Sequence, residues 1–169
     1  ELTDEQRKEA EEKIDSLSSE GLRVIAIAAG YPQTENEVPA SITDCRLTLL
    51  GLVGLADPPR ESVKNDIAVC TKAGIRVVMI TGDNGITASA TAKKVGMPNS
   101  DHIVTGDMLE KMTDAELREA VKDVSIFSRV IPEHKMRIIK AFKDNGEIVA
   151  MTGDGVNDAP ALKYADIGI

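Results

Sequence analysis

Two aspartates follow a short apolar run near the end of the chain, in the segment Met-Thr-Gly-Asp-Gly-Val-Asn-Asp at 151–158. The run at 148–151 is typical of a buried parallel strand, and Thr-Gly-Asp-Gly cannot continue it, so a tight loop must follow. Asp154 and Asp158 lie four residues apart there, a spacing that can bring both carboxylates toward one hard cation. Mg²⁺ fits, because it takes a few carboxylates together with water and phosphate oxygens. The alternative is an Asp-Gly turn with an Asp helix cap, and the clustering of two glycines with Asn157 and Asp158 makes it the weaker one.

The tripeptide Thr-Gly-Asp occurs three times, beginning at Thr81, Thr105 and Thr152, and each copy follows an apolar run. Its glycine lets the chain turn sharply, so that the threonine hydroxyl and the backbone amides can hold a phosphoryl oxygen. A helix cap is the alternative for all three copies. We favour the cap at 105–107, because the strand signal before it is weak, and the phosphoryl-binding interpretation for the other two copies.

Lys135 is a further candidate, because Pro132 predicts the start of a helix that has Lys135 in its first turn. A positive charge at that end of a helix opposes the helix dipole, and such local inconsistencies cluster at functional sites. The neighbouring His134 could act as an acid or a base, but a structural or solvated role is the preferred interpretation.

The elements that must position these residues alternate between strand and helix after residue 60. Apolar runs predict strands at 76–80, 103–104, 124–128 and 147–151, and helices are predicted at 61–73, 87–95, 132–142 and from Thr113 onward. This alternation indicates an α/β fold with a parallel sheet, in which ligands bind beyond the carboxyl ends of the strands.

The first part of the chain has a different pattern. Thr3 is expected to cap a helix, and apolar runs at 22–29 and 47–56 predict strands, the first of them buried. The polar segment 30–44 between them is expected to be a loop. Asp-Pro-Pro-Arg at 57–60 forms a stiff joint, because two prolines fix φ and remove backbone donors, and it is the best candidate for a domain boundary.

Composition argues against several classes of function. The 169 residues carry a net charge of −8, which disfavours a nucleic-acid surface. Cys45 and Cys70 have no CxxC spacing, so neither zinc nor a disulfide framework is expected. No apolar run reaches the roughly 18 residues of a membrane helix and no signal-peptide pattern is present, so we expect a soluble chain. It opens on a charged helix without an initiator Met, and both ends are expected to be cut from something larger.

Four segments together closely resemble the P-type cation-transporting ATPases, and among these the type II group that contains the calcium and sodium/potassium pumps. They are Asp-Pro-Pro-Arg at 57–60, Thr-Gly-Asp-Asn at 81–84, Val-Ile-Pro-Glu-His-Lys at 130–135 and Thr-Gly-Asp-Gly-Val-Asn-Asp-Ala-Pro-Ala-Leu-Lys at 152–163. The resemblance implies a haloacid-dehalogenase-like, Rossmann-like parallel sheet flanked by helices, incomplete here, with a small α+β remnant at the N-terminus. In that superfamily an aspartate takes the γ-phosphoryl group of ATP and is then hydrolysed.

The resemblance also implies a role for each matching residue. Asp154 would help to hold Mg²⁺, and Asp158, a second candidate metal ligand, would support the phosphoryl group together with Asn157. Thr81 and Gly82 would bind the transferred phosphoryl group, Lys135 would neutralise its charge, Asp83 and Arg129 would lie on the nucleotide side, and Arg23 would reach the ATP phosphates. Residues 1–56 would be the C-terminal part of a nucleotide-binding domain, 57–60 a hinge, and 61–169 the phosphorylation domain.

One motif of that family is absent. The phosphorylated aspartate lies in Asp-Lys-Thr-Gly-Thr, which does not occur in this sequence. The chain is therefore expected to be a cytoplasmic part of an ATP-driven cation pump that lacks its nucleophile strand and is inactive alone. Its partners would be ATP and the other domains and membrane helices of a pump at the cytoplasmic face of a membrane, with the transported cation bound elsewhere.

Two other functions remain open. A free-standing phosphatase of the same superfamily would need an early Asp-x-Asp or Asp-x-Thr nucleophile, which Asp57-Pro-Pro does not supply. A non-catalytic phosphate- or Mg²⁺-binding module could use the same crevice.

Overall fold

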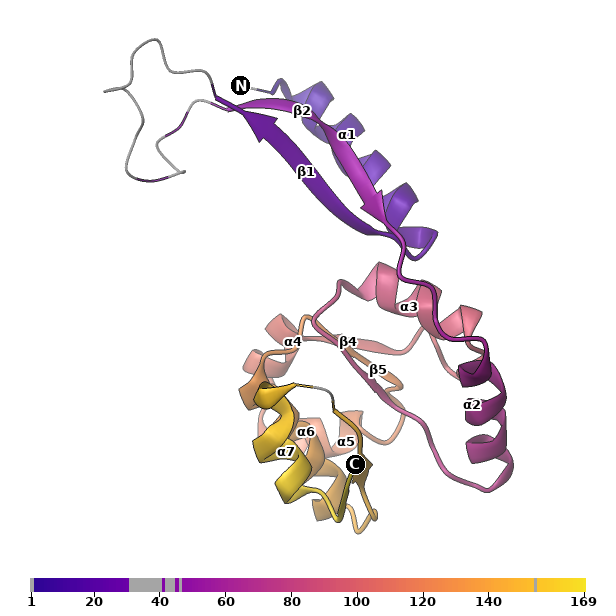
Figure 1. Cartoon of the computed structure of the whole chain (residues 1–169). Coiled ribbons are helices and arrows are strands. Elements are labelled where there is room, and N and C mark those ends of the chain that lie inside the picture. The colour runs from indigo at the N-terminus through magenta and orange to yellow at the C-terminus, as the bar shows by residue number, and fades with distance from the viewer. Residues whose placement is uncertain (1, 31–40, 42–44, 46, 154) are drawn as a thin grey trace. The chain divides into compact units, whose positions relative to one another are not determined.

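The chain divides into two compact units, Glu1–Pro58 and Pro59–Ile169. The structure is a computed structural model that describes residues 2–30, 41, 45, 47–153 and 155–169 (Figure 1). Asp154 and most of the expected loop at 30–44 therefore lie outside the described residues.

The first unit contains one helix and one antiparallel hairpin. Helix α1 (Asp4–Ser19) begins after Thr3, whose hydroxyl accepts a hydrogen bond from the Gln6 amide while the Gln6 side chain accepts one from the Thr3 amide. This reciprocal cap satisfies amides that a helix start leaves without partners. Strand β1 (Arg23–Ala29) then pairs with β2 (Thr48–Leu55), so both strands predicted in this part of the chain are present.

Strand β1 is not buried, and this prediction was wrong. Ile25 and Ile27 are each 46% exposed, and Val53, which pairs with Ile25 across the hairpin, is 41% exposed. Helix α1 contacts both strands, but these three side chains, which share one face of the hairpin, remain exposed. The apolar run specified a strand, whereas burial depends on a second packing layer that the run does not specify.

Parallel strands form the centre of the second unit. Strands β3 (Met79–Ile80), β5 (Ile126–Ser128) and β4 (Ile103–Thr105) form one sheet in that order, and β6 (Ala150–Met151) pairs with β7 (Ile167–Gly168). These pairings are parallel, as the alternation of strands and helices predicts. Strands β3, β5 and β6 are shorter than the apolar runs that predict them, whereas β4 is one residue longer than its run at 103–104. Among the described strands, β3 and β6 each have a neighbour on one side only, so fewer ladder hydrogen bonds extend them toward their first residues.

Helices connect these strands. They are α2 (Ser62–Lys72), α3 (Gly85–Lys94), α4 (Gly106–Lys111), α5 (Asp114–Ala120), α6 (Pro132–Asp144) and α7 (Ala159–Tyr164), with the 3-10 helix Val156–Asp158 before α7. Side chains of Asn84, Thr105 and Thr113 cap α3, α4 and α5, and Pro132 is the first residue of α6. The helix cap favoured for the second Thr-Gly-Asp copy is thus confirmed.

The sheet of β3, β5 and β4 lies between two layers of helices (Figure 1). Ile126 and Phe127 are neighbours on β5 and point to opposite faces, as successive strand residues do. Ile126 packs with residues of α2 and α3, whereas Phe127 packs with residues of α4, α5 and α6. Both side chains are fully buried, so this short central strand anchors both cores.

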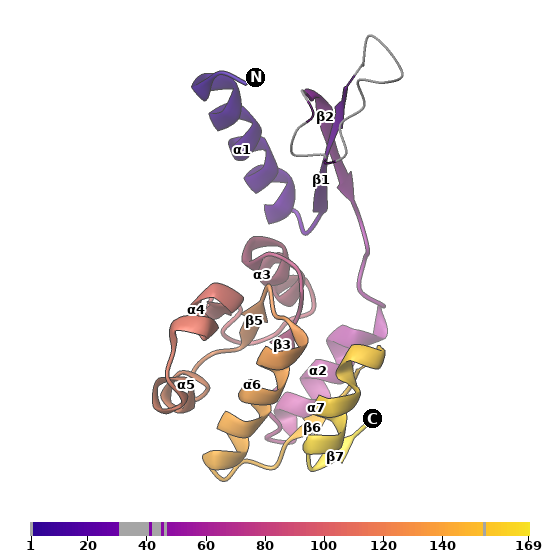
Figure 2. The same ribbon diagram turned by 90° about the vertical axis from the view of Figure 1, so that its left-hand side faces the viewer.

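Helix α6 joins that sheet to the second strand pair. Ile138 belongs to the core around Phe127, whereas Ile139 packs with Met151 of β6 and Ala161 of α7. Figure 2 shows α6 and α7 side by side, in agreement with their contacts. Helix α6 also contacts the 3-10 helix, so it reaches the segment that follows β6. None of the helices in the described ranges is long and apolar enough to cross a membrane.

Candidate functional site

The first Thr-Gly-Asp copy lies at the carboxyl end of β3 and is tied to the segment that ends β5. The Thr81 amide donates to the Phe127 carbonyl (2.9 Å), and the Thr81 carbonyl accepts from the Val130 amide (3.1 Å). The Asp83 carbonyl accepts from the Arg129 amide (2.9 Å), and the Asp83 amide donates to the Thr81 hydroxyl (3.1 Å). These four hydrogen bonds fix the main chain of the loop.

The middle of this loop is open. Gly82 and Asp83 are exposed, and apart from its chain neighbours no described atom lies within 4 Å of the place that a side-chain carbon on Gly82 would take. Asn84 ends the loop by capping α3, with its side-chain oxygen 2.9 Å from the Thr87 amide. The loop therefore presents its main chain to solvent directly before a helix start, where anionic groups are stabilised.

Arg129 has an uncommon backbone conformation, with a φ of 51°. A residue with a β-carbon is disfavoured there by about 1 kcal/mol or more, so its surroundings must hold it in place. The residue itself is exposed. Because strained residues cluster at ligand-binding loops, this conformation favours the predicted place of Arg129 beside a ligand.

Lys135 and Asp158 lie 23 positions apart in the sequence and form an ion pair that joins α6 to the segment after β6. The side chain of Lys135 is 20% exposed and that of Asp158 is 10% exposed, so the pair is largely shielded from water. The carboxylate offsets the unfavourable position of a lysine in the first turn of a helix. Two of the predicted site residues are thus brought together.

Asp158 also packs against the glycine of the third Thr-Gly-Asp copy. A side-chain carbon on Gly153 would lie 2.7 Å from the β-carbon of Asp158 and 2.9 Å from its Oδ2. Any other residue at this position would displace the carboxylate that Lys135 binds. The glycine is therefore needed for close approach.

The predicted magnesium ligands are described only in part. Asp158 is bound to Lys135, Asn157 is exposed on the 3-10 helix, and Asp154 lies outside the described residues. Within the ranges that the structure describes, no three His, Cys, Asp or Glu side chains are grouped so that they could hold a metal ion. Mg²⁺ often takes only one or two carboxylates and completes its shell with water and phosphate oxygens, so the oxygen donors of this segment fit it. The metal-binding role of Asp154 and Asp158 stays a prediction.

His134 is buried, with 6% of its surface exposed, which favours the structural interpretation over the solvated one. Its Nε2 lies 3.8 Å from a carboxylate oxygen of Glu110 of α4, and its Nδ1 has no hydrogen-bond partner among the described residues. Gly106, from the second Thr-Gly-Asp copy, is also buried beside this histidine. This copy therefore forms a packed helix start and no open loop.

Arg23 lies in the first unit, where it is exposed on β1 opposite Leu55. Its predicted contact with nucleotide phosphates stays a prediction.

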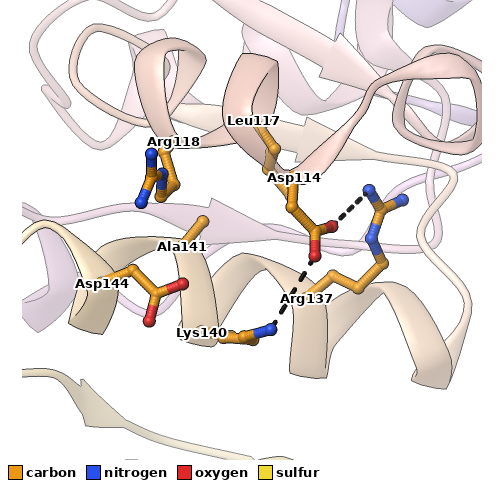
Figure 3. Close-up of a pocket in the computed structure, with 7 residues that line it drawn as sticks. All are labelled: Asp114, Leu117, Arg118, Arg137, Lys140, Ala141 and Asp144. Carbon is orange, nitrogen blue, oxygen red and sulfur yellow. Dashed lines mark hydrogen bonds and ion pairs between the residues drawn. The ribbon is translucent and has the colours of Figure 1, made fainter.

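A polar groove between α5 and α6 is a second place where charged side chains gather (Figure 3). Asp114 lies 3.0 Å from Arg137 and 3.8 Å from Lys140. Arg137 also donates to the carbonyls of Leu109 (2.7 Å) and Met112 (2.8 Å) at the end of α4. These charges are occupied in holding helices together, so the groove is a structural feature and a weak candidate for a binding site.

Two further polar residues with notable surroundings were not predicted from the sequence. Asp166 accepts a hydrogen bond from the Val149 amide (2.9 Å) and lies 2.9 Å from Lys143 of α6. The hydrogen bond from Val149, followed by that from Lys143, holds the pKa of the Asp166 carboxyl below its usual range. Ser128 is fully buried at the end of β5, and its hydroxyl has no partner in the described part of the chain. Each is a polar residue inside an apolar run, which is the signal that could have identified it.

The parallel sheet between helix layers and the polar loops after β3 and β6 define an α/β protein with its candidate site at the strand ends. The haloacid dehalogenase-like hydrolase family matches residues 28–166, and the chain belongs to this family. The predicted haloacid-dehalogenase-like sheet flanked by helices is thereby confirmed.

The curated relatives of the chain include calcium-transporting ATPases. It is 48% identical to the calcium-transporting ATPase of Bacillus subtilis over 170 residues, which cover 99% of this chain and 19% of that protein. It is 45% identical to the calcium-transporting ATPase type 2C member 2 of Homo sapiens over 169 residues, which cover 99% of this chain and 17% of that protein. The predicted resemblance to P-type cation-transporting ATPases is confirmed, and the chain spans less than a fifth of the length of these relatives.

Proposed function

We propose that this chain is the cytoplasmic, phosphoryl-transferring part of an ATP-driven cation pump. Residues 61–169 form most of its phosphorylation domain, 57–60 its hinge and 1–56 the end of its nucleotide-binding domain. The similarity to calcium-transporting ATPases over nearly the whole chain supports this assignment. Calcium is the first cation to test, because the names of these relatives specify it.

The observation that carries the proposal is the shielded ion pair between Lys135 and Asp158. Phosphoryl transfer needs positioned groups and neutralised charge more than covalent help from the protein. Lys135 can exchange its carboxylate partner for a phosphoryl oxygen, and Asp158 is then free to act with Asp154 toward Mg²⁺, with Asn157 in support. When bound, Mg²⁺ supplies charge neutralisation on the phosphoryl oxygens.

The loop after β3 supplies the second set of groups. Gly82 binds the phosphoryl group through its main-chain amide and Thr81 through its hydroxyl, and the open space at Gly82 supports this role. Asp83 and Arg129 share a main-chain hydrogen bond and lie on the nucleotide side. Arg23, in the nucleotide-binding domain, contacts the phosphates of ATP.

The strand edges support the proposal that a further strand belongs to this domain. Among the described strands, β3 pairs only with β5 and β6 only with β7, and β3 and β6 are the strands that precede the two open Thr-Gly-Asp copies. A parallel strand that paired with such an edge would bring its own carboxyl end to the same loops. The phosphorylated aspartate lies on that strand, in the Asp-Lys-Thr-Gly-Thr segment that this sequence does not contain.

The proposal is tested on the parent pump, in which Lys135→Ala is expected to lower Mg²⁺-dependent phosphoenzyme formation from labelled ATP by about 100-fold or more, since one charge-stabilising donor has about that effect. Lys140→Ala, on the exposed side of the same helix, is the matched control and is expected to keep near-normal phosphorylation. Equal phosphorylation of the two variants would contradict the proposal.

The purified chain tests the phosphatase alternative, and the parent protein tests the binding-module alternative. A pump part is expected to bind nucleotide with Mg²⁺, to show no turnover of a generic phosphate ester and to incorporate no acid-stable label from ATP. Ester turnover would establish a phosphatase instead. A parent protein that binds phosphate but moves no cation would indicate a binding module.

A further inference from the structure

Gly106 occupies a position where the chain leaves no room for a side chain. It is buried at the first residue of α4, and a side-chain carbon there would overlap the carbonyl oxygen of Arg129 and lie 3.2 Å from its carbonyl carbon. The same carbon would lie 3.4 Å from Cε1 of His134. The obstacle is main chain, so it cannot be removed by a side-chain rotation.

The local conformation of Gly106 does not itself require glycine. Its φ is not among the positive values of this chain, and the first position of a helix accepts most residues. Thr105 caps α4 through its own side chain, with its hydroxyl 3.3 Å from the Met108 amide. The requirement for glycine therefore comes from the close approach of Arg129.

Arg129 has a strained backbone, with a φ of 51°, and its amide donates a hydrogen bond to the Asp83 carbonyl (2.9 Å). The next amide, that of Val130, holds the Thr81 carbonyl at 3.1 Å. A continuous series of contacts thus connects Gly106, through the main chain of Arg129 and Val130, to Thr81 and Asp83 in the loop after β3. A displacement of the Arg129 carbonyl must alter the hydrogen bonds on either side of it.

We propose that Gly106 is a positioning residue for the phosphoryl-binding loop. Its missing side chain lets the Arg129 peptide sit where the two amides at 129 and 130 fix Thr81 and Asp83. The second Thr-Gly-Asp copy, which forms a helix cap, therefore serves the first copy indirectly. The functional part of this inference rests on the proposed role of Thr81 and Gly82 toward a phosphoryl group.

The test compares Gly106→Ala with Gly51→Ala in the full 169-residue chain. Gly51, on β2, is the control, because its φ is also not positive, no described atom lies within 4 Å of the carbon that the substitution adds, and it belongs neither to the loop nor to the helix that follows it. Amide hydrogen exchange by NMR measures the two loop hydrogen bonds directly. We expect the Arg129 and Val130 amides to exchange about tenfold faster or more in Gly106→Ala.

Inorganic phosphate is the probe of the loop, read from the amide shifts of Thr81 and Gly82 in the same samples. Its dissociation constant is expected to rise on the order of tenfold in Gly106→Ala and to stay unchanged in the control, because misplaced binding groups lose affinity steeply. Amides elsewhere in the sheet, such as Ile126, are expected to keep their protection, which separates a local displacement from general destabilisation.

Unchanged exchange at Arg129 and Val130, or faster exchange with unchanged phosphate affinity, would overturn the positioning role. Equal loss of protection throughout the unit would also overturn it and would make Gly106 a general packing residue. A wild-type chain that shows no phosphate response contradicts the proposed phosphoryl site instead, and the exchange rates still decide whether Gly106 holds the loop.

Discussion

Lys135 and Asp158 hold opposite charges together where water has little access. Removing one partner leaves the other charge shielded and unpaired, which costs more than the pair contributes. We expect Lys135→Met to lower the free energy of unfolding by about 2 kcal/mol in urea denaturation. Lys122→Met, which breaks the exposed pair with Glu119, is expected to change it by less than about 0.5 kcal/mol. If the two variants lost equal stability, the shielding of the Lys135 pair would be refuted.

Asp166 is expected to make the stability of the second unit depend on pH in the acid range. Hydrogen bonds from Val149 and Lys143 lower the pKa of its carboxyl from the ordinary value of 3.8, so the ionised form is favoured in the folded state. Its contribution to stability is fully present above the ordinary pKa and is lost as the pH falls through the folded pKa. The urea midpoint of Asp166→Asn should therefore lie below that of the wild type at pH 7, and the difference should shrink below about pH 4. A difference that stays constant down to pH 2.5 would refute this assignment.

Among the elements, α5 depends on an arginine from another part of the chain. The guanidinium of Arg76, just before β3, donates to the carbonyls of Val121, Lys122 (2.6 Å) and Val124 (3.0 Å), which follow α5. It also lies over the Phe142 ring, 5.2 Å from its centre. These contacts satisfy carbonyls that a helix end leaves without partners, and they join α5 to the strand layer and to α6.

Two nitrogens of one planar guanidinium bind these three carbonyls, and the single ammonium nitrogen of lysine does not reproduce that geometry, so Arg76→Lys is not a conservative change. We expect it to lower the free energy of unfolding by about 2 kcal/mol, whereas Arg118→Lys, exposed on α5, should have little effect. Thermal and urea unfolding of both variants measure the difference. Equal stability of the two would show that Arg76 contributes no more than its charge.

Much of the fold follows from local sequence signals. Thr3, Thr113 and Pro132 mark helix starts that the structure contains. The same local rules could not give burial at Ile25, because burial depends on what packs against a strand. They also overestimated the lengths of β3, β5 and β6, since ladder hydrogen bonds depend on neighbouring strands.

The sequence predicted which residues belong to the candidate site better than it predicted which of them are in contact. Strand ends with Thr-Gly-Asp and a lysine at a helix start identified Thr81, Lys135 and Asp158 as candidates. The sequence could not show that Lys135 pairs with Asp158, because their contact depends on the packing of α6 against the segment after β6. Gly106 was assigned to a cap alone, because its close neighbour, Arg129, is distant in sequence.

For the whole molecule, the division at Pro58 and Pro59 has a consequence for the two parts in isolation. The three apolar clusters that contain the buried core residues lie entirely within 59–169. We expect residues 59–169, expressed alone, to give a dispersed NMR spectrum that overlays on that of the full chain. Residues 1–58 alone should be only marginally stable, since a hairpin with one helix buries little apolar surface. Loss of dispersion in the 59–169 spectrum would show that the second unit needs the first.

The exposed apolar side chains of β1 and β2 are also expected to affect self-association of the chain in solution. Ile25, Ile27 and Val53 share one face of the hairpin and expose apolar surface there, and the net charge of −8 makes two such molecules repel each other. Salt weakens that repulsion without weakening the apolar attraction. The chain should therefore self-associate as ionic strength rises, with particle size followed by light scattering, and Val53→Lys should suppress the effect.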